Sequence, residues 1–173
     1  MPTICCSWDR RINNARRRFK LLSDFKDNAV LDRETGLVWE RQPGNQTFAW
    51  PNARLHCAQK AVGERGGWRL PAFNERFRQI SLSEPNELAS LVDPTITDPA
   101  VPRVPAGHPF LNVQPAMYWT ATVFVEQPGF AIAVNFSFVA GSDAPIGVTD
   151  ANVAGGLYHV WAVRGGSPGV DSY

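Results

Sequence analysis

Residues 66–71 read Gly-Gly-Trp-Arg-Leu-Pro, and this stretch decides how the chain on either side of it is expected to fold. The two glycines allow a turn or a close approach of the main chain, because neither carries a Cβ atom. Trp68 and Leu70 alternate with Arg69, so a short extended segment would place both apolar side chains on one side. Pro71 fixes its own φ and biases Leu70 away from helix. The stretch therefore predicts a structural clip between two elements, in which Trp68 and Arg69 maintain the fold.

The composition is that of one domain with a substantial core. The chain has 173 residues, of which 44% are hydrophobic, and its 14 Gly and 14 Pro indicate many turns. No apolar run approaches the ~20 residues that span a bilayer. Met1–Asp9 shows no basic flank that leads into a long apolar stretch. We therefore expect neither a membrane span nor a visible secretory signal.

The cysteines and histidines do not indicate a metal centre. Cys5, Cys6 and Cys57 lack the spacing of metal ligands, and the three His are scattered. One of Cys5 and Cys6 could form a disulfide with Cys57, and the sequence leaves this alternative open. Cys57 falls in an apolar helical pattern, so we expect a small buried side chain. We predict no metal and no cofactor.

Positive charge is concentrated near the N-terminus of a chain whose net charge is only +1. We divide the chain into a basic arm, residues 1–17, and a single domain, residues 18–173. A basic stretch of this kind suits an anionic glycan, a membrane surface or nucleic acid, or is simply a solvated helix face or a charged strand edge. No nucleic-acid-binding fold is recognisable, so nucleic acid is not the partner we expect. The six cations, with no acid between them, are Arg10, Arg11, Arg16, Arg17, Arg18 and Lys20.

The first half of the chain predicts strands followed by helices. Arg18–Leu22 resembles a strand, and Ala29–Arg41 predicts a β-hairpin whose turn is Glu34-Thr35-Gly36. Trp50–Val62 predicts a helix, with Pro51 in its first turn. Two more helices are expected, over Phe73–Ile80 and from Ser83 through Val92. The apolar stripe of the Trp50–Val62 helix consists of Ala53, Cys57, Ala58, Ala61 and Val62.

The second half predicts loops and strands. Thr95–Pro115 is a long, Pro-rich irregular segment. Strands are expected at Tyr118–Thr122 and over Ile132–Phe138, the latter with a small, polar second face. A loop over about Gly141–Gly156 precedes a closing strand, His159–Arg164. The order predicts an α+β fold with a mainly antiparallel sheet, two or three flanking helices and long loops.

Six motifs in this order resemble the bacterial Lcl C-terminal domain family, named for the end domain of a collagen-like adhesin. The resemblance covers about Phe19 to Gly166 and implies a C-type lectin-like fold, in which both chain ends meet in one sheet and long loops carry the ligand site. The motifs are LDRETGLVWER (31–41), the helix at 50–62, GGWRLP (66–71), ELASLVD (87–93), YWTAT (118–122) and VWAVRGG (160–166). The residues expected to maintain this fold are Trp39, Gly67, Trp68, Arg69, Leu70, Pro71, Trp119, Trp161 and Arg164.

The chain departs from the family pattern in two places. Ala72–Glu84 is an apparent insertion after the clip. Ala162 stands where members often have a cysteine, so the partner that the resemblance implies for Cys57 is missing. The clip also resembles a stretch of formylglycine-generating enzymes, but no cysteine follows Cys57, which argues against thiol catalysis.

The leading functional hypothesis is a non-enzymatic ligand-binding or adhesion module, placed by the resemblance outside the cell or on its surface. The adhesin relative binds sulfated glycosaminoglycans, and the basic arm offers cations for such a ligand. Homo-oligomerisation is compatible with this role. Its partner would be a glycan or a cell-surface protein.

The alternative is the variable ligand-binding protein of a diversity-generating retroelement, with its site on the C-terminal strands and loops. Aromatic and small polar residues mix there as in adaptable binding sites, or they are ordinary core and loop residues. Asp143 and Asp150 lack a partner for acid–base catalysis, so we expect no enzyme. Calcium at Asp143, Asp150 and Asn152 is an alternative that we do not predict. The candidate site residues are Phe130, Asn135, Ser137, Asp150, Asn152 and Tyr158.

Overall fold

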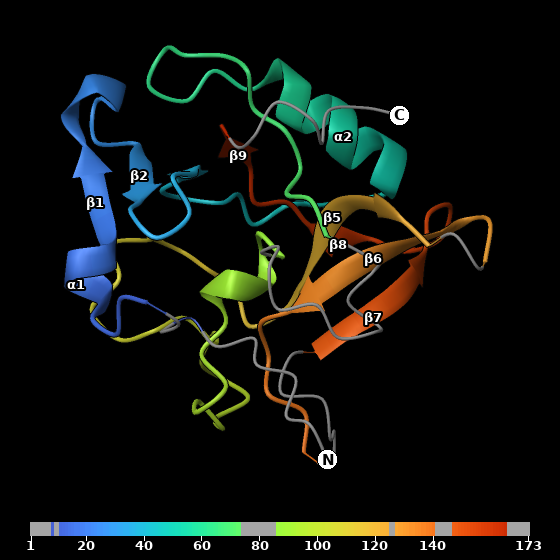
Figure 1. The fold of residues 1–173 in the computed structure, drawn as a ribbon. Helices are drawn as coiled ribbons and strands as arrows, with labels where there is room; N and C mark the ends of the chain where they lie inside the picture. The colour runs from blue at the N-terminus through green and yellow to red at the C-terminus, as the bar shows by residue number, and fades with distance from the viewer. Residues whose placement is uncertain (1–7, 9–10, 74–85, 125–126, 141–146, 166–173) are drawn as a thin grey trace.

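The structure is a computed structural model, which describes residues 8, 11–73, 86–124, 127–140 and 147–165, with the main chain alone for 147–151. The chain forms two sheets with few helices (Figure 1). Its elements in chain order are α1 (Ala15–Arg18), β1 (Phe19–Leu22), the 3-10 turn η1 (Ser23–Phe25), β2 (Ala29–Asp32), β3 (Val38–Glu40), β4 (Thr47–Phe48), α2 (Trp50–Gln59), the 3-10 turn η3 (Ala89–Leu91), β5 (Met117–Val123), β6 (Phe130–Asn135), β7 (Gly147–Asn152), β8 (Tyr158–His159) and β9 (Val163–Arg164).

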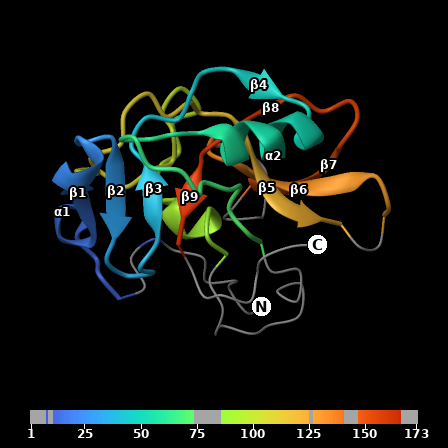
Figure 2. The same cartoon turned by 90° about the horizontal axis from the view of Figure 1, so that it is seen from above.

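The two sheets lie side by side, and α2 covers the second of them (Figure 2). The first sheet has the order β1-β2-β3-β9, and the second has the order β4-β8-β5-β6-β7. Every strand pair is antiparallel except β5 with β8. The last strand returns to pair with the N-terminal hairpin, since β9 lies against β3. The predicted α+β class with mainly antiparallel pairing is therefore confirmed.

The strand and the β-hairpin predicted in the N-terminal part of the chain are both present. β1 lies within the predicted strand, and β2 and β3 form the predicted hairpin, with Leu31 opposite Val38. Gly36, at φ +75°, occupies the turn that required a left-handed residue. Asp32 completes the turn, because its carboxylate accepts the amide of Glu34 and the hydroxyl of Thr35, both at 2.9 Å.

The predicted closing strand His159–Arg164 is wrong as a single strand. Its two ends belong to different sheets, β8 to the second and β9 to the first. The residues between them, Val160–Ala162, are buried, and the indole of Trp161 donates to the carbonyl of Glu40 at 2.8 Å. This segment crosses from one sheet to the other because its side chains fill the core.

The predicted loop over Gly141–Gly156 is also wrong in part, since it contains β7. Six consecutive residues of β7 pair with β6, from Phe130 opposite Asn152 to Asn135 opposite Gly147. β7 is an edge strand, and edge strands need not have an apolar face. A polar sequence can therefore pair along its full length.

The helices are shorter than expected. α2 ends at Gln59, and Ala58 and Ala61 of the expected apolar stripe are exposed, while Ala53 and Cys57 are fully buried. The expected helix reaching Val92 is a single 3-10 turn, η3. The expected helix Phe73–Ile80, and the Ser83 start of the next one, lie outside the described residues apart from Phe73.

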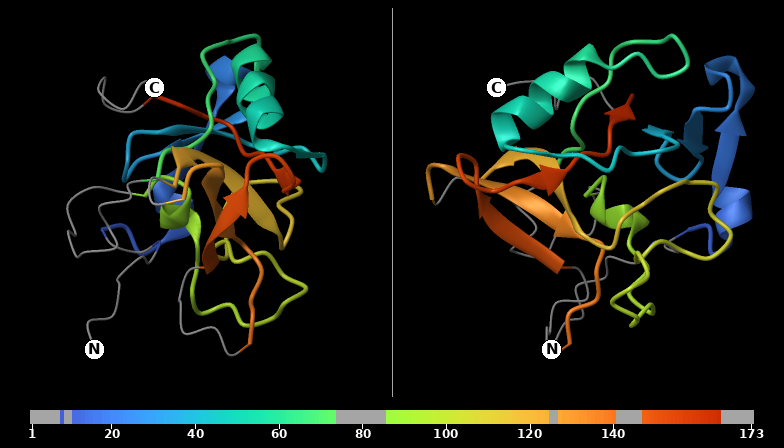
Figure 3. Two further views of the ribbon diagram at one scale, coloured as in Figure 1. Left: turned by 90° about the vertical axis from the view of Figure 1, so that its right-hand side faces the viewer. Right: turned by 180° about the vertical axis from the view of Figure 1, so that it is seen from behind.

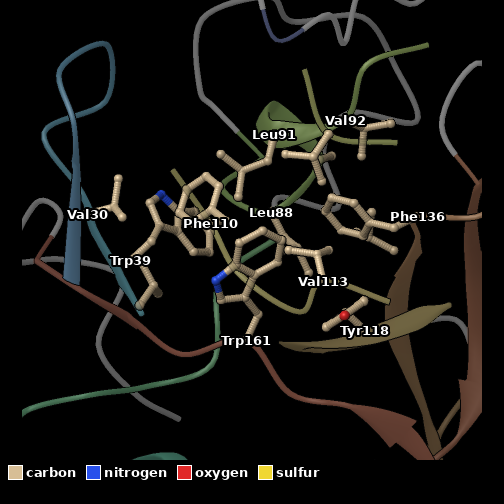
Figure 4. Packing of buried hydrophobic residues seen from close by; sticks show 14 of the residues in the cluster. Val30, Trp39, Leu88, Leu91, Val92, Phe110, Val113, Tyr118, Phe136 and Trp161 are labelled. Carbon is tan, nitrogen blue, oxygen red and sulfur yellow. The ribbon is translucent and has the colours of Figure 1, made fainter. Parts of the chain in front are cut away.

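Two buried clusters form the core, one on each side of the second sheet. In the first, the rings of Trp39, Phe110 and Trp161 meet edge to face (Figure 4). In the second, Ala53 and Cys57 of α2 pack on Trp119 of β5. α2 lies on one side of this sheet, and the chain around η3 lies on the other (Figure 3). β6 contributes to both clusters, because Ala133, on its small and polar second face, is fully buried in the second cluster.

Residues 66–71, where the sequence predicts a clip, contact several distant segments of the chain. Trp68 is buried and its indole donates to the carbonyl of Arg65 at 2.6 Å. The main chain of Arg69 exchanges two hydrogen bonds of 2.9 Å with Val163 of β9. The guanidinium of Arg69 forms a bidentate pair with Glu87, at 2.7 and 2.8 Å, and also donates to the carbonyl of Gly165. The clip therefore fastens the chain around η3 to the C-terminal strand.

Candidate functional site

A cluster of exposed cations lies at the β1 edge of the first sheet. The side chain of Asn14 caps α1 by accepting the amide of Arg17 at 3.2 Å. Ala15 and Phe19 are buried in the first core cluster. α1 and β1 are thereby fixed on the domain, and Arg16, Arg17 and Lys20 are left exposed.

Arg18 does not belong to this cluster, contrary to the prediction. Its side chain and that of Asp32 are fully buried. The guanidinium donates from Nε and Nη2 to the two carboxylate oxygens of Asp32, at 2.8 and 2.6 Å, and from Nη1 to the carbonyls of Trp8 and Ser90. The backbone pairing of Phe19 with Asp32 brings the two together. The predicted boundary between arm and domain, after residue 17, falls inside α1.

Arg33 joins the cluster from the neighbouring strand. It follows β2 directly, is exposed, and donates from its guanidinium to the carbonyl of Arg17 at 3.2 Å. The amide of Arg33 donates to the carbonyl of Arg18, which continues the β1–β2 ladder by one step. Within the part of the chain that the structure describes, none of the four exposed cations forms an ion pair. We call them the basic edge surface: Arg16, Arg17, Lys20 and Arg33.

Gly107 of the long Pro-rich segment makes room for one of these cations. It has φ +87°, and a Cβ built on it would lie 3.3 Å from Cγ of Arg16. The arginine stem therefore rests against the main chain of this segment. Two other cations were predicted for the arm. Arg10 lies outside the described residues. Arg11 is exposed, and its main-chain amide donates to the carboxylate of Glu34.

The six candidate residues of the C-terminal strands do not converge on one site. Phe130 and Asn152 pair at one end of the β6–β7 ladder, and Asn135 lies at the other end. Five residues along a strand correspond to about 17 Å. The main chain of Asp150 pairs with Ile132, between the two ends.

Several of these side chains already have local partners. The amide oxygen of Asn135 accepts the N–H of Ser137, and that of Asn152 accepts the N–H of Ala154, both at 2.8 Å. Such bonds stabilise turns. Tyr158 lies on β8 with its ring 4.7 Å from that of the buried Trp119. Asp143, the remaining member of the calcium alternative, lies outside the described residues.

A second buried ion pair joins α2 to the first sheet. Lys60 donates to Glu40 at 2.5 Å, and the other oxygen of Glu40 accepts the amide of Ala162 at 3.4 Å. Burial raises the pKa of Glu40, and Lys60 opposes that shift. Burial likewise raises the pKa of the Cys57 thiol to about 12. Cys57 is thus a buried small side chain, as predicted.

The described residues contain neither a metal-binding cluster nor a membrane-spanning helix. No three His, Cys, Asp or Glu side chains among them are grouped so as to hold a metal ion. Within the same ranges, no helix has both the length and the apolar character to cross a membrane.

The Lcl C-terminal domain family matches the chain over residues 28–164. The match covers well over half of the sequence, so the chain belongs to this family. No curated protein and no solved structure matches the chain. The matched range includes Arg33, the clip and both sheets except β1, whereas Arg16, Arg17 and Lys20 precede it. The basic edge surface is therefore assembled across the boundary of the family domain.

Proposed function

We propose that this chain is a non-enzymatic ligand-binding module of the adhesion type, which binds a sulfated glycan through the basic edge surface. The observation that carries the proposal is the group of four exposed cations on α1, β1 and the residue after β2, none of them ion-paired within the described residues. Arginine and lysine recognise sulfate by charge-assisted hydrogen bonds. Membership of the Lcl C-terminal domain family is consistent with such a module.

A C-type lectin-like fold is part of the proposal. In that fold both chain ends meet in one sheet, and the pairing of β9 with the β2–β3 hairpin supports it. The absence of enzymatic activity is supported by the roles of three buried carboxylates. Asp32, Glu40 and Glu87 each hold a structural cation, which is the use expected of residues that maintain a fold.

Glycan-array binding at low salt and at about 0.5 M salt tests the proposal, because screening weakens exposed ion pairs. We expect capture of sulfated glycans, no capture of the same glycans without sulfate, and loss of the signal at high salt. The triple variant Arg16→Gln/Arg17→Gln/Lys20→Gln should lose the signal, whereas Arg54→Gln, on the exposed side of α2, should keep it. Absence of binding at low salt would contradict the proposal and favour a protein ligand at the β6–β7 ladder.

A further inference from the structure

The described part of the predicted arm ahead of α1, Trp8 and residues 11–14, is attached to the domain. Trp8 is half-buried and packs on the first core cluster. The carbonyl of Trp8 accepts a hydrogen bond from Nη1 of the buried Arg18. At the other end of the segment, the side chain of Asn14 caps α1. The segment is therefore fixed near both of its ends.

One carboxylate holds the middle of this segment. Oε2 of Glu34, in the turn between β2 and β3, accepts the main-chain amides of Arg11 and Ile12 at 3.2 and 3.0 Å. The amide of Glu34 donates in turn to the carboxylate of Asp32 at 2.9 Å, so the turn is itself fixed. Hydrogen bonds in which the acceptor is ionised are stronger than those between neutral groups. We call the contact of Glu34 with the amides of Arg11 and Ile12 the Glu34 clamp.

The Glu34 clamp places Arg11 next to the basic edge surface. Glu34 follows directly after Arg33, and the guanidinium of Arg33 donates to the carbonyl of Arg17 at 3.2 Å. Arg11 is exposed, and its side chain forms no ion pair with any residue that the structure describes. Arg11 is thus a fifth exposed cation beside the four of the basic edge surface, and its main chain is held in place.

We propose that Arg11 binds the sulfated glycan together with the basic edge surface, and that the Glu34 clamp positions Arg11 for this contact. The inference rests on the proposed function and adds to it one binding cation and one positioning residue. A cation on an unattached segment loses conformational entropy when a ligand orders it, whereas the clamped main chain is already ordered. Glu34 therefore has two opposing effects, because its charge repels a polyanion while its hydrogen bonds hold Arg11.

Two substitutions of Glu34 separate these two effects. Glu34→Gln and Glu34→Ala both remove the negative charge, but only Gln keeps a side-chain oxygen that can accept the two amides. The loss of charge alone would make both variants bind heparin more tightly than wild type, and to the same extent. With the clamp, Glu34→Ala should instead bind heparin at least about threefold more weakly than Glu34→Gln.

A double-mutant cycle tests whether this difference acts through Arg11. Dissociation constants for heparin are measured with the full chain by isothermal titration calorimetry at several salt concentrations. In the Glu34→Gln background, Arg11→Gln should weaken binding about threefold and lower the slope of log affinity against log salt by about one. In the Glu34→Ala background the same substitution should have a smaller effect, because Arg11 is no longer held. Arg11→Lys, which keeps the charge, should retain most of the affinity.

The outcomes separate this inference from the proposed function. Failure of the wild-type chain to bind heparin would overturn both. Loss of binding in the Arg16→Gln/Arg17→Gln/Lys20→Gln variant, with equal affinities for Glu34→Gln and Glu34→Ala, would overturn the positioning role of Glu34 and leave the basic edge surface standing. Wild-type affinity in Arg11→Gln would remove Arg11 from the site. Circular dichroism of each variant establishes that it is folded before affinities are compared.

Discussion

Replacing Asp32 by Asn tests the most consequential correction to the sequence-based prediction, the burial of Arg18. The Asp32 carboxylate accepts two hydrogen bonds from Arg18, one from the amide of Glu34 and one from the hydroxyl of Thr35. Both side chains of the ion pair are fully buried. Asp32→Asn removes the negative charge and leaves a buried guanidinium without its counter-ion.

Breaking a buried pair from one side costs about 3–5 kcal/mol, because the remaining charge stays out of water. Single domains are stable by about 5–15 kcal/mol, so this is a large fraction of the free energy of unfolding. For a chain of this length the melting temperature should fall by about 6–20 °C. Arg18→Met combined with Asp32→Asn should lose less than Asp32→Asn alone, since no unpaired charge is then buried.

Urea unfolding followed by tryptophan fluorescence measures this loss. Asp27→Asn is the control, because it removes the same charge from an exposed position, and it should change stability by less than about 0.5 kcal/mol. A loss for Asp32→Asn no larger than that of the control would refute the reasoning. Arg18 would then be hydrated, and it would belong with the cations of the basic edge surface.

Three further changes have expected outcomes. Trp68→Ala should lower the free energy of unfolding by about 3–5 kcal/mol, and an unchanged urea midpoint would contradict the clip. Burial lowers the pKa of His108 below its ordinary 6.5. The unfolded chain therefore binds the proton more readily, and the free energy of unfolding should decrease as pH falls from 6.5 toward the lowered pKa. His108→Gln should reduce this pH dependence, measured as the urea midpoint at each pH. With its pKa raised to about 12, Cys57 should resist iodoacetamide in a variant whose two N-terminal cysteines are serine, and rapid native labelling would show that it is accessible.

Local patterns predicted much of the fold. The β2–β3 hairpin was visible because a turn sequence with glycine separates two short apolar runs. The clip was visible because Trp68 and Leu70 alternate next to two glycines, and both side chains are buried. In each case the residues that specify the element lie within a few positions of one another.

What the sequence did not predict depends on contacts between distant segments. The partner of Arg18 is set by the register of β1 on β2, and that register is not encoded in the charges of residues 10–20. The break between β8 and β9 follows from the burial of Trp161 between two sheets, although the residues read as one apolar strand. β7 is an edge strand without an alternating apolar pattern.

In the candidate site, too, the sequence predicted local features but not the contacts between distant segments. Exposure of Arg16, Arg17 and Lys20 agrees with the predicted basic stretch. Arg33 was missed because it lies 13 residues beyond Lys20 in sequence and is brought to it only by the β1–β2 pairing. The expectation of a C-terminal site grouped residues by composition, but the β6–β7 ladder separates them along its length.

The central claim is that the basic edge surface binds a sulfated polyanion. Its most direct test is the dissociation constant for heparin, measured by isothermal titration calorimetry with the wild-type chain, the Arg16→Gln/Arg17→Gln/Lys20→Gln variant and Arg54→Gln. We predict that the triple variant binds at least about tenfold more weakly than wild type and that Arg54→Gln binds like wild type. Equal affinities for wild type and the triple variant would contradict the claim.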